Sequence, residues 1–136
     1  MSKAGENVVI LLVLALIAPV LYWLASIMPI HVDEAITHRY FVSDGFKVAL
    51  TSYRFPNNHV LFSLLAGLPI PFFKEPTLAM RLISVIAGLA NAFLLFKILR
   101  EKVNVRISIY GVLLWITSFG GFFYATHARG YGLQLV

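Results

Sequence analysis

Two adjacent acids, Asp33 and Glu34, are the first residues of this chain whose types suggest chemistry. They follow a run from Val8 to Ile30 that holds no Asp, Glu, Lys, Arg or His. A carboxylate placed here can act as a general base toward an acceptor hydroxyl, or can hold a divalent metal ion. Acids in a first helical turn also interact favourably with the helix dipole, so the pair can equally mark a helix start. Since neighbouring helical residues point about 100° apart, one acid would act and the other would support it.

A second group of polar residues lies near the end of the sequence, in "THARGYGLQLV". Arg129 follows an uncharged run, and its guanidinium group is well shaped to bind phosphate oxygens. Tyr131 can donate a hydrogen bond to the same ligand. His59, in "PNNH", can contact a phosphate or an acceptor. Plainer alternatives stay open, because Arg129 can reach the headgroups from a helix end and His59 can be a polar helix end.

The composition of the chain indicates that these residues belong to a membrane protein. Of 136 residues, 60% are hydrophobic and 12% are charged, whereas soluble domains are nearer half apolar and a quarter charged. No cysteine is present, which excludes disulfides, thiolate catalysis and cysteine-ligated metals. The net charge of +5 comes from basic residues that flank apolar runs. We therefore interpret this charge as a membrane orientation signal and expect no nucleic-acid partner.

Three apolar runs are long enough to cross a bilayer, at about 8–30, 79–99 and 107–126. The first gives roughly 34 Å of helix, and a bilayer core is about 30 Å thick. It is not expected to be a signal peptide, because "YWLASIMP" offers only a poor cleavage site. Arg81 and Lys97 lie near the ends of the second run, where long basic side chains are expected to reach the headgroups.

The segment between the first two spans is predicted to hold helices that lie in the membrane interface. Val60–Phe73 is apolar but short and contains two prolines, so it fits a helix in the interface better than a span. Asn57 or Asn58 can cap its start. A second interfacial helix is expected from about Asp33 to Val42, with aromatic and basic residues at the headgroups. The turn residues Ser43–Gly45 would end it.

The distribution of charge predicts how these spans are oriented. The short loop in "KILREKVNVR" is basic and is expected on the cytoplasmic side together with Lys3. With three spans, residues 31–78 and 127–131 then both lie outside. We therefore predict an all-α membrane protein with three transmembrane helices and interfacial juxtamembrane helices in the first outer loop. The acids, the histidine and the arginine described above would share this outer face.

The sequence ends as another helix is beginning. "GYGLQLV" looks like the start of a further apolar helix that has no length left to cross a membrane. We therefore interpret residues 1–136 as the N-terminal part of one polytopic membrane domain.

These pieces resemble the membrane-embedded glycosyltransferases of the GT-C class that use polyprenyl-phosphate sugars, such as protein O-mannosyltransferases and the lipid A aminoarabinose transferase. Asp33-Glu34 resembles the "DE" of that family's first outer loop, and "RFPNNHVLFSLL" the stretch before its juxtamembrane helix. "AMRLISVIAGLANAFLLFKILRE" resembles its second span, and "HARGYGLQLV" an "ARxY" element after the third. The resemblance covers nearly all of the chain, and it is the order of the motifs that makes it specific.

The resemblance implies an inverting transfer of a sugar from a polyprenyl-phosphate donor to a glycan, lipid or protein acceptor at the outer membrane face. It implies that Asp33 is the base or orients the acceptor, and that Glu34 supports it. Arg129 would neutralise the leaving lipid phosphate, with assistance from Tyr131. His59 is a further candidate for contact with the phosphate. The candidate catalytic residues are thus Asp33 and Glu34, and the candidate substrate-binding residues are His59, Arg129 and Tyr131.

The chain also departs from this family. The aminoarabinose transferase has a Lys-Pro where this chain reads Asn57-Asn58-His59, and an acid found in some members is not evident around 127–133. A full member has many more spans, so we expect this chain to be inactive alone.

Two alternatives remain. The chain can be a complete small three-span scaffold or subunit without catalysis. A transporter fragment is less favoured, since the first and third spans lack the ionisable residues typical of transport paths. The expected setting is a bilayer, most simply a plasma membrane with the active face outside. A divalent cation is left open as a cofactor.

Overall fold

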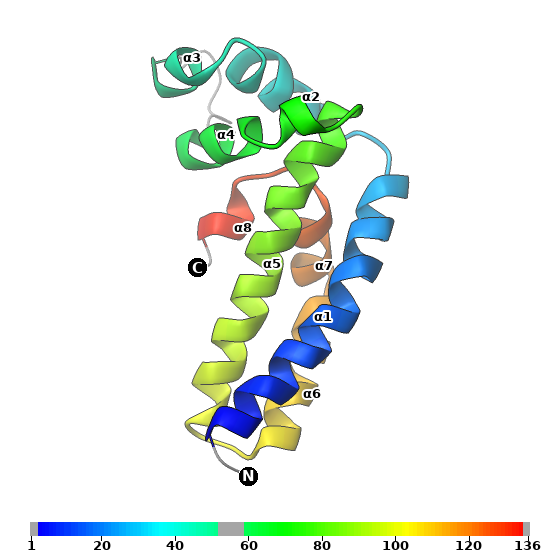
Figure 1. Ribbon diagram of the computed structural model, residues 1–136, viewed down its shortest axis with the longest axis vertical. Coiled ribbons are helices and arrows are strands. Elements are labelled where there is room, and N and C mark those ends of the chain that lie inside the picture. The colour runs from blue at the N-terminus through cyan, green and yellow to red at the C-terminus, as the bar shows by residue number, and fades with distance from the viewer. Residues whose placement is uncertain (1–2, 52–58, 135–136) are drawn as a thin grey trace.

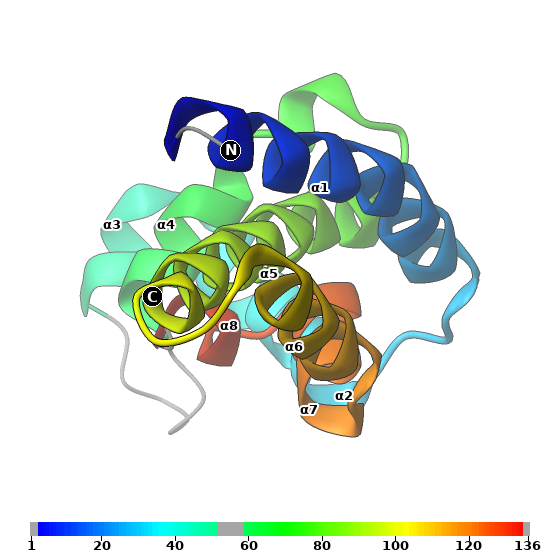
Figure 2. The same ribbon diagram turned by 90° about the horizontal axis from the view of Figure 1, so that it is seen from below.

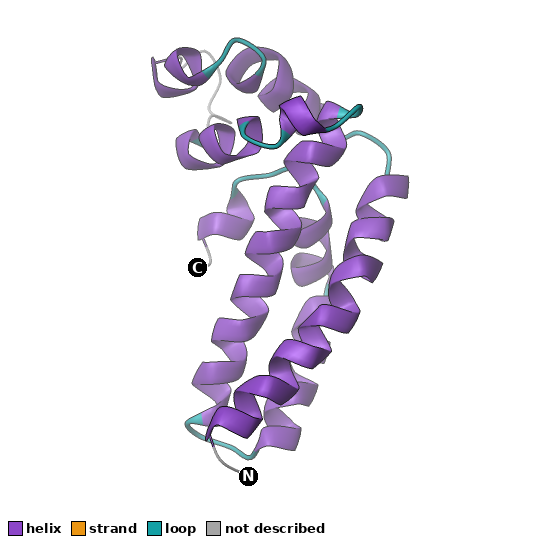
Figure 3. Cartoon of the chain, viewed as in Figure 1, coloured by secondary structure: helices purple, strands orange, loops and turns teal. Residues whose placement is uncertain are grey.

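The computed structural model describes residues 3–51 and 59–134, and within these ranges every regular element is helical (Figure 3). The predicted all-α fold class is therefore confirmed. The elements are α1 (Lys3–Ile27), α2 (Val32–Thr37), the π-helix η1 (His38–Val42), α3 (Phe46–Thr51), α4 (Val60–Gly67), the 3₁₀ turn η2 (Ile70–Phe72), α5 (Pro76–Arg100), α6 (Val105–Thr117), α7 (Phe119–Thr126) and α8 (Tyr131–Gln134).

Two helices, α1 and α5, are each long and apolar enough to cross a membrane on their own. Each has 25 residues, which corresponds to roughly 37 Å of helix. The third predicted span corresponds to two helices, α6 and α7, that meet at a bend of 65°, so it is either a broken span or a re-entrant loop. Ser118 causes the break: its backbone is extended, and its hydroxyl accepts a hydrogen bond from the Gly121 amide at 3.2 Å to cap α7. The sequence predicted one span over 107–126, and the bend within it was not predicted.

Helix α5 is the central element of the bundle. It packs against α1 on one side and against α6 and α7 on the other (Figure 2). Small residues allow the closest approach: a Cβ added to Gly88 would lie 2.6 Å from the Cβ of Ala125 on α7. Such contacts between small residues are typical of helix packing in membranes. The outer side of α1 exposes Leu16 and Trp23, as expected of a lipid-facing surface.

The short helices α2, η1, α3 and α4 gather at one end of this bundle (Figure 1). We call this the head end. The helix expected near residues 33–42 is present as α2 and η1, and Gly45, with φ of 85°, follows the turn that ends it. Its position in the membrane interface stays a prediction. The apolar segment 60–73 forms only α4 and η2, too short to cross a membrane. His59 occupies the N-cap position of α4, and the predicted caps Asn57 and Asn58 lie outside the described residues.

The two ends of the bundle carry the segments that the charge pattern assigned to them. The start of α1 and the loop between α5 and α6 lie at the base, opposite the head end (Figure 1). The segment between α7 and α8 runs back toward the head end, so residues from the first loop and from "HARGY" lie near one another. The side of the membrane that each end faces stays a prediction from charge.

Candidate functional site

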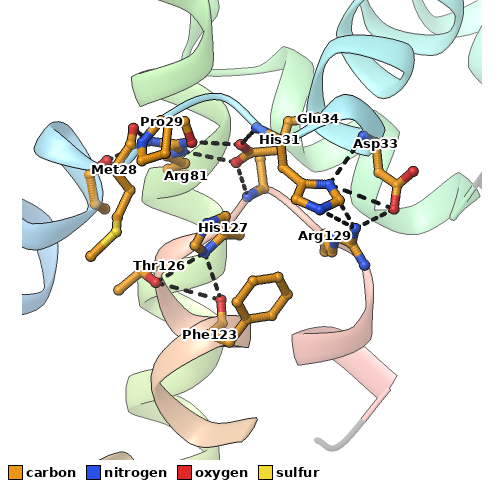
Figure 4. A network of polar contacts seen from close by, with 12 residues as sticks. Met28, Pro29, His31, Asp33, Glu34, Arg81, Phe123, Thr126, His127 and Arg129 are labelled. Atoms are coloured by element: carbon orange, nitrogen blue, oxygen red, sulfur yellow. Dashed lines mark hydrogen bonds and ion pairs between the residues drawn. The ribbon is translucent and has the colours of Figure 1, made fainter. Parts of the chain in front are cut away.

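The head end is organised where α1 stops and α2 starts. Helix α1 ends at Ile27, and the chain turns through Pro29 to His31, which is the N-cap of α2. The His31 amide donates a hydrogen bond to Oε2 of Glu34 at 2.8 Å, and the Asp33 amide donates to Nδ1 of His31 at 3.3 Å (Figure 4). The acid pair therefore does mark a helix start, as the simpler interpretation predicted.

Glu34 also forms a buried ion pair with Arg81 of α5. Nε and Nη2 of Arg81 donate to the two carboxylate oxygens of Glu34 at 2.8 and 2.6 Å. Glu34 is 0% exposed and Arg81 2% exposed. The prediction that Arg81 reaches the headgroups is therefore wrong. A carboxylate lies at the same depth beside α5, and a charge inside an apolar bundle is stabilised far better by such a partner.

The remaining donors of Arg81 bind the end of α1. Nη1 donates to the carbonyls of Ala25 at 2.6 Å and Met28 at 2.8 Å, and Nη2 donates to that of Pro29 at 2.8 Å. All five N–H groups of the guanidinium therefore have acceptors. These carbonyls lie at or just beyond the C-terminus of α1, where a helix leaves carbonyls unpaired and attracts positive charge. Arg81 thus fastens α1 and α2 to α5.

Glu34 connects this assembly to the distant "HARGY" segment. The amide of Ala128 donates to Oε1 of Glu34 at 2.6 Å. With the bonds from Arg81 and His31, both carboxylate oxygens are engaged on two sides. Burial raises the pKa of Glu34, but these hydrogen bonds and the charge of Arg81 outweigh it and leave the pKa below its ordinary value. Glu34 therefore stays ionised and holds Ala128 in place.

Because Ala128 is anchored, the next residue meets Asp33. Nη2 of Arg129 donates to Oδ2 of Asp33 and, at 2.8 Å, to Nδ1 of His31. The guanidinium also lies over the Phe123 ring, 5.4 Å from its centre, a cation–π contact. Nδ1 of His31 is therefore close to two donors, the Asp33 amide and the Arg129 guanidinium. Within the described part of the chain, Nε of Arg129 is buried without a hydrogen-bond partner.

A small hollow joins this ion pair to the other predicted residues. It is lined by Asp33, Thr37, His59, Arg129 and Tyr131 and has a volume of about 10 Å³, roughly what one water molecule needs. The rings of His59 and Tyr131 meet edge to face, 4.7 Å apart. Burial and the charge of Arg129 lower the pKa of His59, so its ring is neutral at pH 7.

A glycine permits this convergence. Gly130 lies so close to His59 that a Cβ built on it would be 2.2 Å from the Cβ of His59. No other residue would let the start of α4 approach the "HARGY" segment in this way. The sequence placed this glycine between the two predicted binding residues, but its role was not predicted.

The structure thus brings together Asp33, His59, Arg129 and Tyr131, and places Glu34 behind them in the buried ion pair. Sequence reasoning missed Thr37, the acceptor role of His31 and the part played by Arg81. A lone arginine a few residues into an apolar run did hold a signal, because such a charge needs an anionic partner nearby. His127 was also missed: its ring stacks on Phe123 at 4.3 Å, and burial lowers its pKa.

No ready-made metal centre is evident in the described residues: nowhere among them do three or more His, Asp or Glu side chains form a group that could hold a metal ion. No protein-family model, curated protein or solved structure matches the chain. The length and apolar composition of its helices indicate that the chain spans a membrane. The resemblance to GT-C glycosyltransferases stays a prediction from the motifs.

Proposed function

We propose that this chain is a module of a membrane glycosyltransferase that moves a sugar from a polyprenyl-phosphate donor to an acceptor at one membrane face. One observation carries the proposal. A carboxylate and a guanidinium from segments 96 residues apart meet in a hollow at the end of an apolar bundle, with His59 and Tyr131 beside them. A sugar on a lipid phosphate would present its reacting carbon and its charge at this level of the membrane.

The proposed reaction is a single in-line displacement. The acceptor hydroxyl gives its proton to Asp33 and bonds to the anomeric carbon, while the bond from that carbon to the phosphate oxygen breaks. The configuration of the sugar inverts. The departing lipid phosphate gains negative charge, which Arg129 neutralises, and the hydroxyl of Tyr131 donates a hydrogen bond to it.

In this proposal the donor must first separate the two charged groups. Arg129 is bound to Asp33 through Nη2 in this structure, whereas the reaction needs its charge at the departing phosphate. A phosphate offers the guanidinium the same fork of two oxygens that a carboxylate does. Donor binding would therefore move Arg129 from Asp33 to the phosphate and leave Asp33 able to act as base. The donor would bind before the acceptor reacts.

Glu34 has a different part in the proposal. It is fully buried, and its oxygens already accept hydrogen bonds from Arg81, His31 and Ala128. It is therefore a positioning residue that fixes Ala128 and, through it, Arg129. Of the two predicted catalytic acids, Asp33 is the one to which we assign proton transfer.

The test is an assay of sugar transfer in membranes from cells that express the full product of the gene. A labelled polyprenyl-phosphate sugar is the donor. We expect Asp33→Asn to reduce transfer by about 10²–10⁴-fold, as loss of a general base does. Asp44→Asn is the matched control, since Asp44 is an exposed acid in the turn that follows η1. Unchanged transfer by the Asp33 variant would refute the catalytic role.

The partner exchange has its own measurement. Binding of a short polyprenyl phosphate, followed by ³¹P NMR, should strengthen in Asp33→Asn, because the competing carboxylate is gone. It should weaken in Arg129→Gln. Equal weakening in both variants would show that the two residues act only by holding the head end together.

That last outcome would favour a non-catalytic scaffold, the second candidate function. One observation supports it: Asp33 and Arg129 already bind each other, and the hollow has room for about one water molecule. A scaffold would lose stability, and not transfer, when either residue is replaced.

A further inference from the structure

The base of the bundle, opposite the head end, contains a second concave region. It is a groove of about 310 Å³ between the start of α1 and the end of α5. The groove is lined by Lys3, Glu6, Asn7, Phe96, Lys97, Arg100 and Glu101. It lies far from the proposed reaction site and does not depend on the proposed function.

An ion pair forms one wall of this groove. Arg100 donates to the two carboxylate oxygens of Glu6 from Nε at 2.9 Å and from Nη2 at 2.7 Å, and its Nη1 donates to the carbonyl of Val103 at 3.0 Å. Glu6 is 7% exposed. The charges of Glu6 and Arg100 therefore cancel, and the pair fixes the spacing of α1 and α5. The net charge at the rim of the groove comes from the other lining residues.

The rim of the groove carries surplus positive charge. Lys97 donates to the neutral side-chain amide of Asn7 at 3.2 Å, so this contact does not offset its charge. Lys3 is exposed on the facing helix, and Glu101 is the exposed acid among the lining residues. The neighbouring hollow on the other side of the ion pair adds Arg106. This end of the bundle therefore attracts anions.

The groove also lies at the depth where lipid headgroups are found. Helices of 25 residues are longer than the ~30 Å hydrocarbon core requires, so their last turns enter the headgroup layer. An exposed apolar side chain continues from the groove along α1: Leu11, one helical turn after Asn7 on the same face, is 55% exposed. A ligand with a negative head and apolar tails would match both surfaces.

We propose that this groove is a binding site for an anionic phospholipid. Its phosphate would lie between the ammonium groups of Lys3 and Lys97, and its acyl chains would run along α1 past Leu11, toward the middle of the bilayer. Basic pockets between transmembrane helices are known to select such headgroups.

The test is native mass spectrometry of the protein purified in detergent and incubated with phosphatidylglycerol or phosphatidylcholine. We expect phosphatidylglycerol to be retained and phosphatidylcholine to be lost. Lys3→Gln/Lys97→Gln should weaken phosphatidylglycerol binding roughly 25-fold, about fivefold for each lysine. Glu101→Gln should strengthen it by up to about fivefold, because it removes an opposing charge.

The matched control is Lys47→Gln/Lys74→Gln, which removes two exposed lysines elsewhere on the protein. It should leave binding unchanged. Equal losses in the two double variants, or equal retention of the two lipids, would overturn the proposal. A further arm adds millimolar inorganic phosphate: persistence of the lipid supports a lipid site, whereas complete displacement means a site for free phosphate and overturns it. Unchanged helicity by circular dichroism confirms that each variant is folded.

Discussion

Two ion pairs at the head end begin from adjacent residues in the sequence and have opposite characters. Glu34 pairs with Arg81 in the interior, where neither side chain is more than 3% exposed. Asp33 pairs with Arg129 beside a hollow, and its side chain remains 33% exposed. The first guanidinium has acceptors for all of its donors. The second leaves its Nε without a hydrogen-bond partner in the described part of the chain.

The difference shows that two adjacent acids, Asp33 and Glu34, can have different roles. Removing one partner of a buried pair leaves an uncompensated charge, so such a pair is fixed once the protein has folded. A partly exposed pair contributes little stability and can exchange partners with a ligand. We infer that the buried pair holds the head end in shape, and that in the proposed function the partly exposed pair would take part in the reaction.

The largest expected effect compares the two arginines directly. Arg81→Met leaves Glu34 buried without its cation and should lower the free energy of unfolding by about 3–5 kcal/mol. Arg129→Met should lower it by about 1 kcal/mol or less. Thermal unfolding in detergent micelles, followed by circular dichroism, measures both. Equal losses of unfolding free energy in the two variants would show that the two ion pairs do not differ in this way.

A smaller effect than that of Arg81→Met is expected from Gly130→Ala, which acts on the packing of the hollow beside the exchangeable pair. The new methyl group would overlap the Cβ of His59 and should destabilise the protein by about 1–3 kcal/mol. It should also shift the NMR signals of the His59 ring while those of His127 stay in place. Gly120→Ala is the control, because a Cβ there meets no atom within 4 Å. If Gly130→Ala changed neither the stability nor the His59 signals, the hollow would not be closely packed.

The smallest effect is the pH dependence of the buried pair. The pKa of Glu34 is lowered on folding, so the unfolded state binds its proton more readily. The resulting stability is present above the ordinary pKa of 4.5 and is lost as the pH falls through the lower folded value. Melting temperatures between pH 6 and pH 3 should fall more steeply in the unmodified protein than in Glu34→Gln. Parallel curves would show that Glu34 does not contribute in this way.

Much of the architecture could be predicted because membrane spans follow from long apolar runs. The charge pattern also predicted that Asp33, His59 and Arg129 would lie at one end of the bundle. What could not be predicted depends on depth and rotation between helices. The partner of Arg81 lies 47 residues away, and only the packing of α1 against α5 sets the two at one level. The bend at Ser118 was missed because a serine within an apolar run does not by itself indicate a break.

Arg81 and Arg100, near the two ends of α5, together affect how the protein fits a membrane. Arg81 is bound to the top of α1 and Arg100 to Glu6 near its base, and their separation along α5 is roughly 29 Å. That length is close to the thickness of a bilayer's hydrocarbon core. Fastened to each other at both levels, α1 and α5 cannot slide to suit a thicker or thinner membrane. The protein must tilt as one body, or the surrounding lipid must adjust its thickness to the protein.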